Sequence, residues 1–234
     1  MKIGKVSYLN TIPLFYSWEG DFELIEGHPR ELTIALREGR IQGGIVSSVE
    51  YLINKDRYKL IGDFCIASRE RACSVIICSD KQIETIKTLS LSEHSLSSNL
   101  LAIYLLKGVE VLKPGKSADA RVIIGDEAFK AIGGCRYFYD LVSLWRSKTG
   151  LGFVFALFMV RKDVDNKEIK KLELNIHNSL ERFFSSIPKH LEAKRDYFTR
   201  CLHYRLTEED FMSLKVFEDI LSSQLYNFQK EVLE

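Results

Sequence analysis

Short polar side chains gather where predicted strands end and helices begin, and their types and spacing suit the binding of an anion. The three junctions hold Asn10 with Thr11, Ser47 with Ser48, and Ser95 with Ser97 and Ser98. In open α/β sheets, helix N-termini beyond the carboxyl ends of strands offer free backbone N–H groups and a partial positive charge. The pattern therefore favours a carboxylate or phosphate site without a basic patch.

Helix capping explains part of this pattern. Ser47 and Glu50 have the spacing of a capping box, and Thr11 and either Ser97 or Ser98 are suitable N-caps. For any one of these residues a cap is the better interpretation. A cap uses one polar residue per helix, however, so the additional polar residues at each junction remain evidence for a ligand site.

Composition narrows the classes of function. The chain has 234 residues, 46% of them hydrophobic, with 33 basic against 32 acidic residues. Because basic and acidic residues nearly cancel, the protein has no overall electrostatic field that would attract nucleic acid or an anionic membrane. The longest apolar run, residues 153–160, is too short to cross a bilayer, and the first ten residues lack the apolar region of a signal peptide. We expect a cytoplasmic protein.

Motifs for cofactors and metals are missing from the sequence. It contains neither GxGxxG nor GxxxxGK[ST], neither HExxH nor GxSxG, and its histidines lack the spacing of metal ligands. We therefore expect no metal and no cofactor. The five cysteines lack ligand spacing and lie in or beside apolar segments, which predicts buried free thiols in a reducing compartment.

Alternating strand and helix patterns predict an α/β fold of two lobes. Strands are expected over residues 2–9, 22–26 and 41–47, with helices over 12–18 and 29–38, the second closed by Gly39. A second α/β set begins near residue 81, and the pattern is helical after residue 161. We predict lobe I over residues 1–79 and 158–234, with the C-terminal helices packed on it. Lobe II would span residues 80–157, with a ligand cleft between the lobes.

Several segments, in order, resemble the chorismate dehydratase family, which acts in the futalosine route to menaquinone. They are VSYLNTIPLFY, GHPRELTIALREGRIQGGIVSSVEYL, ACSVIICS, SEHSLSSNLLAIYLL, VIIGDEA, YDLVSLWRSKTGLGFVFA and LHYRLTEEDFMSLKVF. The resemblance covers nearly the whole chain. It implies a fold like type II periplasmic binding proteins and a hydro-lyase that eliminates water from chorismate, giving 3-[(1-carboxyvinyl)oxy]benzoate. The implied partner is this small-molecule substrate; the oligomeric state is not predicted.

The resemblance also assigns residues to the site. It implies that Asn10 of the SYLN motif and Ser74 of the CSV strand are catalytic and touch the substrate. The remaining substrate-binding residues implied are Ser47, Ser48, Ser97, Ser98, Gly125 and Asp126. Two candidates remain for the general base. Our hypothesis is that the substrate's own enolpyruvyl carboxylate takes the proton, and Asp126 is the alternative.

The chain departs from the family pattern at a few positions. Gln42 replaces an acidic residue, Gly152 stands where the family has proline, and Arg69 and Arg71 make the approach to Ser74 more basic. Glycine lacks the fixed φ of proline, so Gly152 is expected to loosen the returning strand.

Two other functions fit the same sequence. One is 1,4-dihydroxy-6-naphthoate synthase, which acts later in the same pathway and has the same implied fold. The other is a non-catalytic cytoplasmic module that binds small carboxylates. An enzyme would consume chorismate, whereas a binding module would leave it unchanged.

Overall fold

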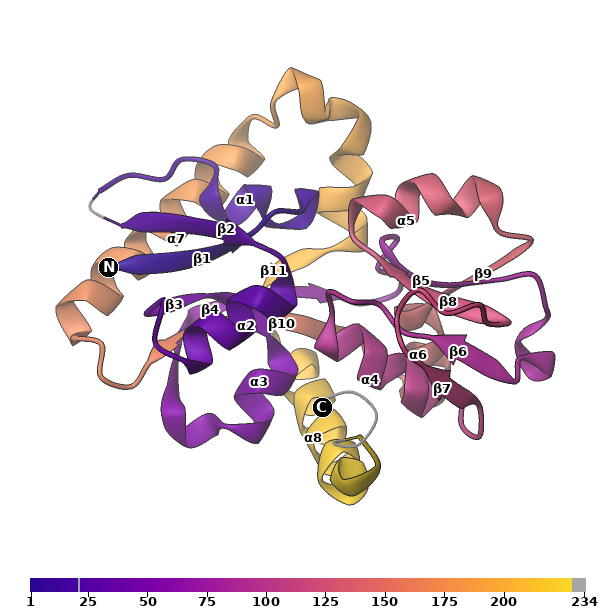
Figure 1. Cartoon of the computed structure of the whole chain (residues 1–234). Coiled ribbons are helices and arrows are strands. Elements are labelled where there is room, and N and C mark those ends of the chain that lie inside the picture. The colour runs from indigo at the N-terminus through magenta and orange to yellow at the C-terminus, as the bar shows by residue number, and fades with distance from the viewer. Residues whose placement is uncertain (21, 229–234) are drawn as a thin grey trace. The chain divides into compact units, whose positions relative to one another are not determined.

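The chain folds into two compact α/β units in the computed structural model, which describes residues 1–20 and 22–228 (Figure 1). The first unit comprises Met1–Ala67 and Val154–Leu206. The second comprises Ser68–Phe153 and, among the described residues, 207–228. Within the described residues, no helix is both long and apolar enough to cross a membrane.

The first unit is built on a six-stranded sheet in the order β11-β4-β10-β3-β1-β2. The strands are β1 (Lys2–Val6), β2 (Glu23–Gly27), β3 (Gly43–Ser47), β4 (Tyr58–Ser68), β10 (Phe153–Arg161) and β11 (His203–Arg205). Its α-helices are α1 (Ile12–Phe15), α2 (Pro29–Arg37), α3 (Ser48–Ile53) and α7 (Asn166–Ser185). Short 3₁₀ segments lie at Leu9–Thr11, Lys55–Arg57 and Lys189–Lys194, and a π-helical segment at Tyr197–Cys201.

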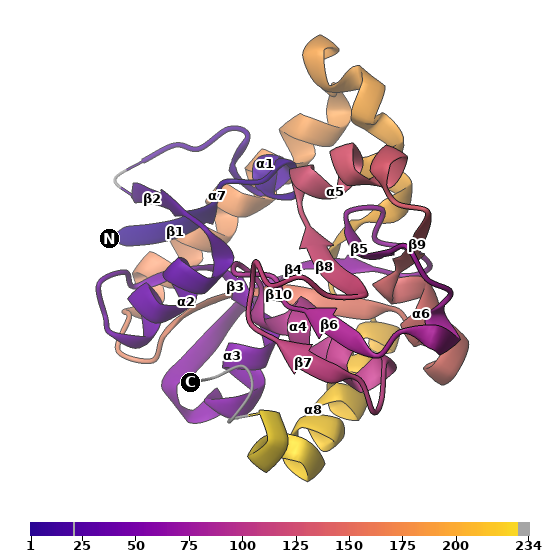
Figure 2. The same ribbon diagram turned by 45° about the vertical axis from the view of Figure 1, so that its right-hand side comes forward.

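The predicted parallel βαβ pattern of the first unit is confirmed. Strand β1 pairs in parallel with both β2 and β3. Figures 1 and 2 show α2 and α3 on one side of the sheet and α1 and α7 on the other. Helix α2 begins with a capping box, in which the backbone N–H of His28 donates to Glu31 at 3.0 Å, and Gly39 follows its end with φ at +77°.

The second unit has a five-stranded sheet in the order β7-β6-β8-β5-β9. The strands are β5 (Val75–Ser79), β6 (Thr88–Ser90), β7 (Glu110–Leu112), β8 (Ala120–Ile124) and β9 (Tyr137–Asp140). Its α-helices are α4 (Leu96–Leu105), α5 (Asp126–Ala131), α6 (Leu141–Thr149) and α8 (Glu208–Phe228), with 3₁₀ segments at Ile83–Thr85 and Ile132–Gly134. Helices α4 and α6 cover one face of the sheet and α5 lies over the other (Figures 1 and 2).

The observed units depart from the predicted lobes at two places. Strand β5, which we expected to close lobe I, is hydrogen-bonded between β8 and β9 in the second unit. Helix α8, also expected on lobe I, packs on the second unit, where the Phe217 ring lies 6.0 Å from that of Trp145 and 4.9 Å from that of Phe153. The aromatic packing partner of a helix is a tertiary property, which an amphipathic pattern alone does not specify.

Gly152 is tightly held, contrary to the expectation that it loosens the strand. Its N–H donates to the Glu209 carboxylate at 2.9 Å, and its carbonyl accepts from Trp145 Nε1 at 2.8 Å and from Ser213 Oγ at 2.6 Å. A Cβ atom at this position would lie 2.5 Å from the carbonyl oxygen of Ser68. Glycine is required here by the close approach of two backbone segments.

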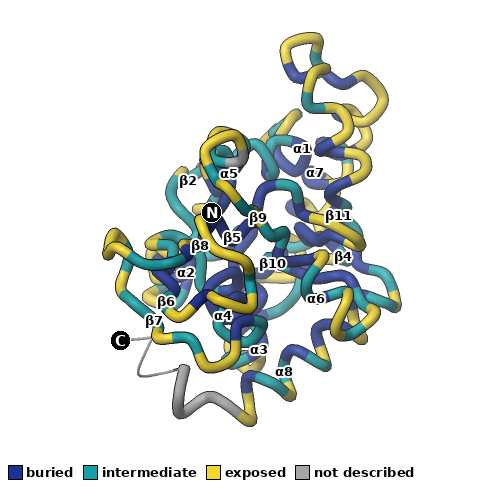
Figure 3. Tube along the Cα trace, turned by 90° about the vertical axis from the view of Figure 1, so that its right-hand side faces the viewer, coloured by how far each residue is buried: buried dark blue, intermediate teal, exposed yellow. Residues whose placement is uncertain are grey.

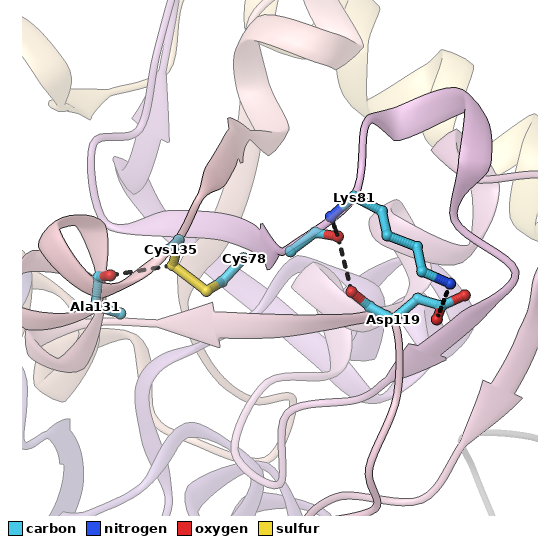
Figure 4. Close-up of a disulfide and its surroundings, with 6 residues drawn as sticks. Cys78, Lys81, Asp119, Ala131 and Cys135 are labelled. Atoms are coloured by element: carbon cyan, nitrogen blue, oxygen red, sulfur yellow. Dashed lines mark hydrogen bonds and ion pairs between the residues drawn. A yellow bond between two sulfur atoms is a disulfide. The ribbon is translucent and has the colours of Figure 1, made fainter.

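A disulfide joins Cys78 of β5 to Cys135, which follows the Ile132–Gly134 turn (Figure 4). The prediction of free thiols is therefore wrong for these two residues, and it is also wrong for Cys73 and Cys201, which are disulfide-bonded. Cys65 is a buried free thiol. The disulfide lies beside α5, most of which is exposed or half-buried (Figure 3). Ala128 is the buried residue of that helix. The disulfide thus anchors a segment that little apolar burial holds to the sheet.

Candidate functional site

Three of the predicted site residues lie at one edge of the first unit's sheet. Asn10 is in the 3₁₀ turn that follows β1, Ser47 is the last residue of β3, and Ser48 is the first residue of α3. Strands β1 and β3 are parallel neighbours, so their carboxyl ends meet at the same edge. The structure therefore brings these polar residues together as the strand pattern predicted.

The amide oxygen of Asn10 is buried and has no hydrogen-bond partner among the described residues. The adjacent Thr11 fixes the turn, because its hydroxyl contacts the carbonyl oxygens of Val6 at 2.7 Å and of Tyr8 at 3.0 Å. Buried polar atoms are nearly always hydrogen-bonded in folded proteins, to protein groups or to ordered water. The amide oxygen of Asn10 thus keeps an acceptor site that ordered water or a bound molecule can fill.

Ser48 has a structural contact of its own. Its hydroxyl is fully buried and donates to the carbonyl of Val154 at 2.7 Å, which ties the start of α3 to strand β10. The proton of this hydroxyl is therefore used within the protein. Ser48 can still accept a hydrogen bond through a free lone pair.

The predicted capping box of Ser47 and Glu50 does not form. No side-chain bond caps α3, and Glu50 instead accepts hydrogen bonds from Arg37 at 2.5 Å, Tyr58 at 2.6 Å and Asn54 at 3.0 Å. The Glu50 side chain is fully buried. Burial, followed by the hydrogen bond to Glu50, raises the pKa of Tyr58 well above its usual value. This Glu50 cluster holds α3, and with it Ser47 and Ser48, against α2 and β4.

Replacing Glu50 by alanine is expected to lower the free energy of unfolding by about 3 kcal/mol, because buried polar partners lose their acceptor. Tyr58 would be left with an unpaired hydroxyl, since it is only 3% exposed. Urea denaturation measures the change. Glu50→Gln is the matched control, with a smaller loss expected because its amide oxygen still accepts from Tyr58. Equal stability of Glu50→Ala and the unmodified protein would contradict this account.

The other predicted residues lie at one edge of the second unit's sheet. Strands β6 and β8 are parallel and lead to the α4 and α5 helix starts, while β5 runs antiparallel to β8 and begins at the same edge. Ser74 therefore lies beside Gly125, whose N–H donates to the Ser74 carbonyl at 2.8 Å. Gly125 has φ at +63°, a conformation that favours glycine, and Asp126 is the first residue of α5.

Ser97 and Ser98 belong to the first turn of α4 and are each 2% exposed. The expectation that one of them is the N-cap is wrong. Ser95 caps the helix instead, since its Oγ accepts from the backbone N–H of Ser98 at 3.2 Å and contacts the Ser98 hydroxyl at 2.8 Å. The preceding loop is closed by Asn99, whose amide contacts the backbone N–H of Ser92 at 2.9 Å.

A groove of about 950 Å³ lies beside this edge in the second unit. Its lining includes residues 90–94, which leave β6, residues 121–124 of β8, and Glu127 and Lys130 of α5. This volume is in the range that binds small molecules. Ser74, Ser97, Ser98, Gly125 and Asp126 are not among its lining residues, so the groove and the predicted set are neighbours rather than one site.

Sequence reasoning missed one residue next to Ser74. Asp140 ends β9 and caps α6, and its carboxylate also accepts from the backbone N–H groups of Ala72 and Cys73. An Asp directly before an apolar helical run, as in YDLVSLW, is a recognisable N-cap signal. That signal predicts the capping role of Asp140, but it does not predict the hydrogen bonds that Asp140 accepts from residues 72 and 73. Within the described residues, no group of three or more His, Cys, Asp or Glu side chains could hold a metal.

Solved structures similar to this chain define its fold class. Protein AF1704 from Archaeoglobus fulgidus has a TM-score of 0.73 at 14% identity, with 95% of this chain and 97% of that chain covered. The periplasmic aliphatic sulphonate binding protein SsuA from Escherichia coli has a TM-score of 0.63 at 12% identity, with 97% and 92% covered. The predicted α/β fold of the periplasmic-binding-protein kind is confirmed.

The family follows from the sequence comparison. A family model described as menaquinone biosynthesis matches residues 1–223, and the chain belongs to that family. It is 29% identical to a chorismate dehydratase from Campylobacter jejuni, with 93% of this chain and 96% of the relative covered. It is 26% identical to a chorismate dehydratase from Thermus thermophilus, with 94% of each covered. The resemblance in the sequence motifs is confirmed at the level of the family.

Proposed function

We propose that this protein is a chorismate dehydratase, a hydro-lyase that converts chorismate to 3-[(1-carboxyvinyl)oxy]benzoate in menaquinone biosynthesis. The observation that carries the proposal is the match to two chorismate dehydratases over 93% and 94% of the chain. The polar, largely uncharged strand ends of both units agree with it, because fixed neutral donors can hold a dicarboxylate.

Asn10 and Ser74 are the proposed catalytic residues, and both are held by the backbone around them. The amide oxygen of Asn10 is buried and unpartnered among the described residues, so it can accept from a substrate hydroxyl. Ser74 is 2% exposed and follows a turn that hydrogen bonds fix on both sides. Ser47, Ser48, Ser97, Ser98, Gly125 and Asp126 complete the proposed substrate-binding set.

The proposed reaction breaks a ring C–H bond and the neighbouring C–OH bond, and the ring becomes aromatic. The electron pair of the C–H bond forms the new ring double bond, and the hydroxyl leaves with a proton as water. Aromatisation provides much of the driving force, so the protein mainly orients the hydroxyl and the abstracted proton. We propose that the enolpyruvyl carboxylate of the substrate accepts that proton.

Asp126→Asn tests the identity of the base. The variant is expected to keep at least a tenth of kcat, because the substrate carboxylate does not depend on this side chain. Steady-state kinetics and chorismate affinity are measured together. Loss of turnover with unchanged affinity would identify Asp126 as the base. Glu127→Gln, at the neighbouring exposed position of α5, is the matched control.

The function is tested by offering the purified protein chorismate and, separately, the cyclic futalosine intermediate, with binding measured by calorimetry. We expect turnover of chorismate alone. Conversion of the cyclic intermediate would instead identify 1,4-dihydroxy-6-naphthoate synthase. Binding of chorismate without turnover would identify a non-catalytic module.

We also propose a cytoplasmic location. Thiols are kept reduced in that compartment, so the Cys78–Cys135 pair is expected to be partly reduced there. Thiol labelling of freshly lysed cells measures the state of this pair. A fully oxidised pair would contradict the proposed location.

A further inference from the structure

Asp140 connects the cap of a helix to the turn that precedes Ser74. Its Oδ1 accepts from the backbone N–H groups of Val142 at 2.9 Å and Ser143 at 3.2 Å, which is ordinary capping of α6. The same oxygen accepts from Ala72 N at 3.1 Å, and Oδ2 accepts from Cys73 N at 2.8 Å. A cap alone does not require the last two bonds, which reach 68 and 67 residues back along the chain.

The backbone at Cys73 is in an unfavourable conformation. Its φ is +63°, and it is the one residue other than glycine with positive φ in the part of the chain that the structure describes. Cβ-bearing residues rarely adopt this region, and such residues persist where the surroundings hold them. Cys73 is disulfide-bonded, which is one constraint on the residue. The Asp140 carboxylate supplies another that acts directly on its backbone, because Oδ2 binds the N–H of Cys73.

Ser74 comes directly after Cys73, and its own backbone is fixed by the Gly125 N–H at 2.8 Å. Its hydroxyl lies 3.4 Å from the carbonyl oxygen of Ala72, within the turn that Asp140 holds. A change of φ at Cys73 would rotate this turn and move the Ser74 hydroxyl. Burial raises the pKa of the Asp140 carboxyl above its usual value, although the four N–H contacts oppose that shift.

We propose that Asp140 is a positioning residue for Ser74: through Oδ2 it holds Cys73 in the left-handed conformation that directs the Ser74 hydroxyl to the substrate. The proposal rests on the proposed function only for its catalytic consequence. The structural claim is that the Asp140 carboxylate fixes the turn at residues 72–74, and the hydrogen bonds of those residues support it.

Asp140→Asn separates the two roles of the carboxylate. Asparagine is as good an N-cap as aspartate, and its one oxygen can replace Oδ1 and serve three of the N–H groups. Its NH₂ group then faces the Cys73 N–H, where two donors meet and no bond forms. Asp140→Ser is the second variant, because serine also caps a helix but its side chain is too short to serve both segments.

Asp165→Asn is the matched control. Asp165 caps α7 in the first unit and accepts from the Lys167 N–H at 2.7 Å. The same loss of a capping carboxylate therefore occurs at a helix of the first unit, whereas Ser74 belongs to the second. We expect kcat/KM for chorismate to fall at least 10-fold in both Asp140 variants, mainly through kcat, and to stay within 2-fold in the control.

Amide NMR spectra provide the readout that does not depend on activity. In Asp140→Asn, the resonances of Cys73 and Ser74 are expected to shift further than those of Val142 and Ser143, whose bonds to the side-chain oxygen are kept. A merely structural role would lower the melting temperature and leave kcat per folded molecule unchanged, which would overturn the proposal. Unmoved Cys73 and Ser74 resonances would also overturn it. If the unmodified protein does not consume chorismate, the proposed function fails, and the spectra still decide whether Asp140 fixes the turn.

Discussion

Alanine at Asn10 or at Ser74 is expected to lower kcat/KM for chorismate by about 100-fold or more, while the protein stays folded. A loss of about 100-fold corresponds to about 2.7 kcal/mol of transition-state stabilisation, the size seen when one preorganised hydrogen-bonding group is removed. Asn10→Ala removes an oxygen that has no partner among the described residues, so little stability should be lost. Ser74→Ala removes a hydroxyl that lies 3.4 Å from the carbonyl oxygen of Ala72.

Steady-state kinetics measure these losses, and circular dichroism checks the fold. Ser79→Ala is the matched control for Ser74, because Ser79 lies at the opposite end of β5 and its hydroxyl donates to the Asp119 carbonyl at 2.7 Å. Asn175→Ala on α7 is the control for Asn10. Activity of Asn10→Ala and Ser74→Ala within about 3-fold of these controls would show that neither residue acts on the substrate.

Removing the Cys78–Cys135 disulfide by alanine at both positions is expected to lower the free energy of unfolding by about 4 kcal/mol at most. The bonded residues are 57 positions apart, and a crosslink of that span restricts the unfolded chain strongly. Figure 4 shows the disulfide beside the carbonyl of Ala131, to which Cys135 Sγ lies at 3.0 Å. The variant therefore also frees the end of α5.

Guanidinium denaturation of the oxidised protein and of the double variant measures this difference. Cys65→Ala is the control, because Cys65 is a buried free cysteine. Its loss should be limited to that of a small buried side chain, about 1 kcal/mol. A double variant as stable as the control would contradict the stabilising role of the disulfide.

The sequence pattern predicted the parallel βαβ part of the first unit's sheet and the strand ends at which the proposed site residues lie. The strands and the helix on either side of Gly39 follow from local hydrophobic periodicity, which can be read directly in the sequence. The polar residues after β1 and β3 can be located in the same way, because they follow the predicted strands. Asn10 and Ser74 were selected by resemblance, since local patterns favour capping equally well at such positions.

The parts that failed depend on contacts between distant residues. Glu50 has the capping-box spacing from Ser47, but its carboxylate binds Arg37 and Tyr58 instead. Tertiary packing brings these three side chains together. Cys78 and Cys135 are separated by 57 residues, and Asp140 lies 67 residues after Cys73. No local pattern shows such pairs, so the disulfide and the contacts behind the proposed role of Asp140 required the structure.

The central claim is that the protein eliminates water from chorismate. The most direct measurement is incubation of the purified protein with chorismate, without added metal or nucleotide, followed by mass spectrometry and ultraviolet absorbance. We predict loss of one water and formation of the meta-substituted benzoate, with a rate proportional to protein concentration. Chorismate recovered intact, or converted no faster than in buffer alone, would contradict the claim.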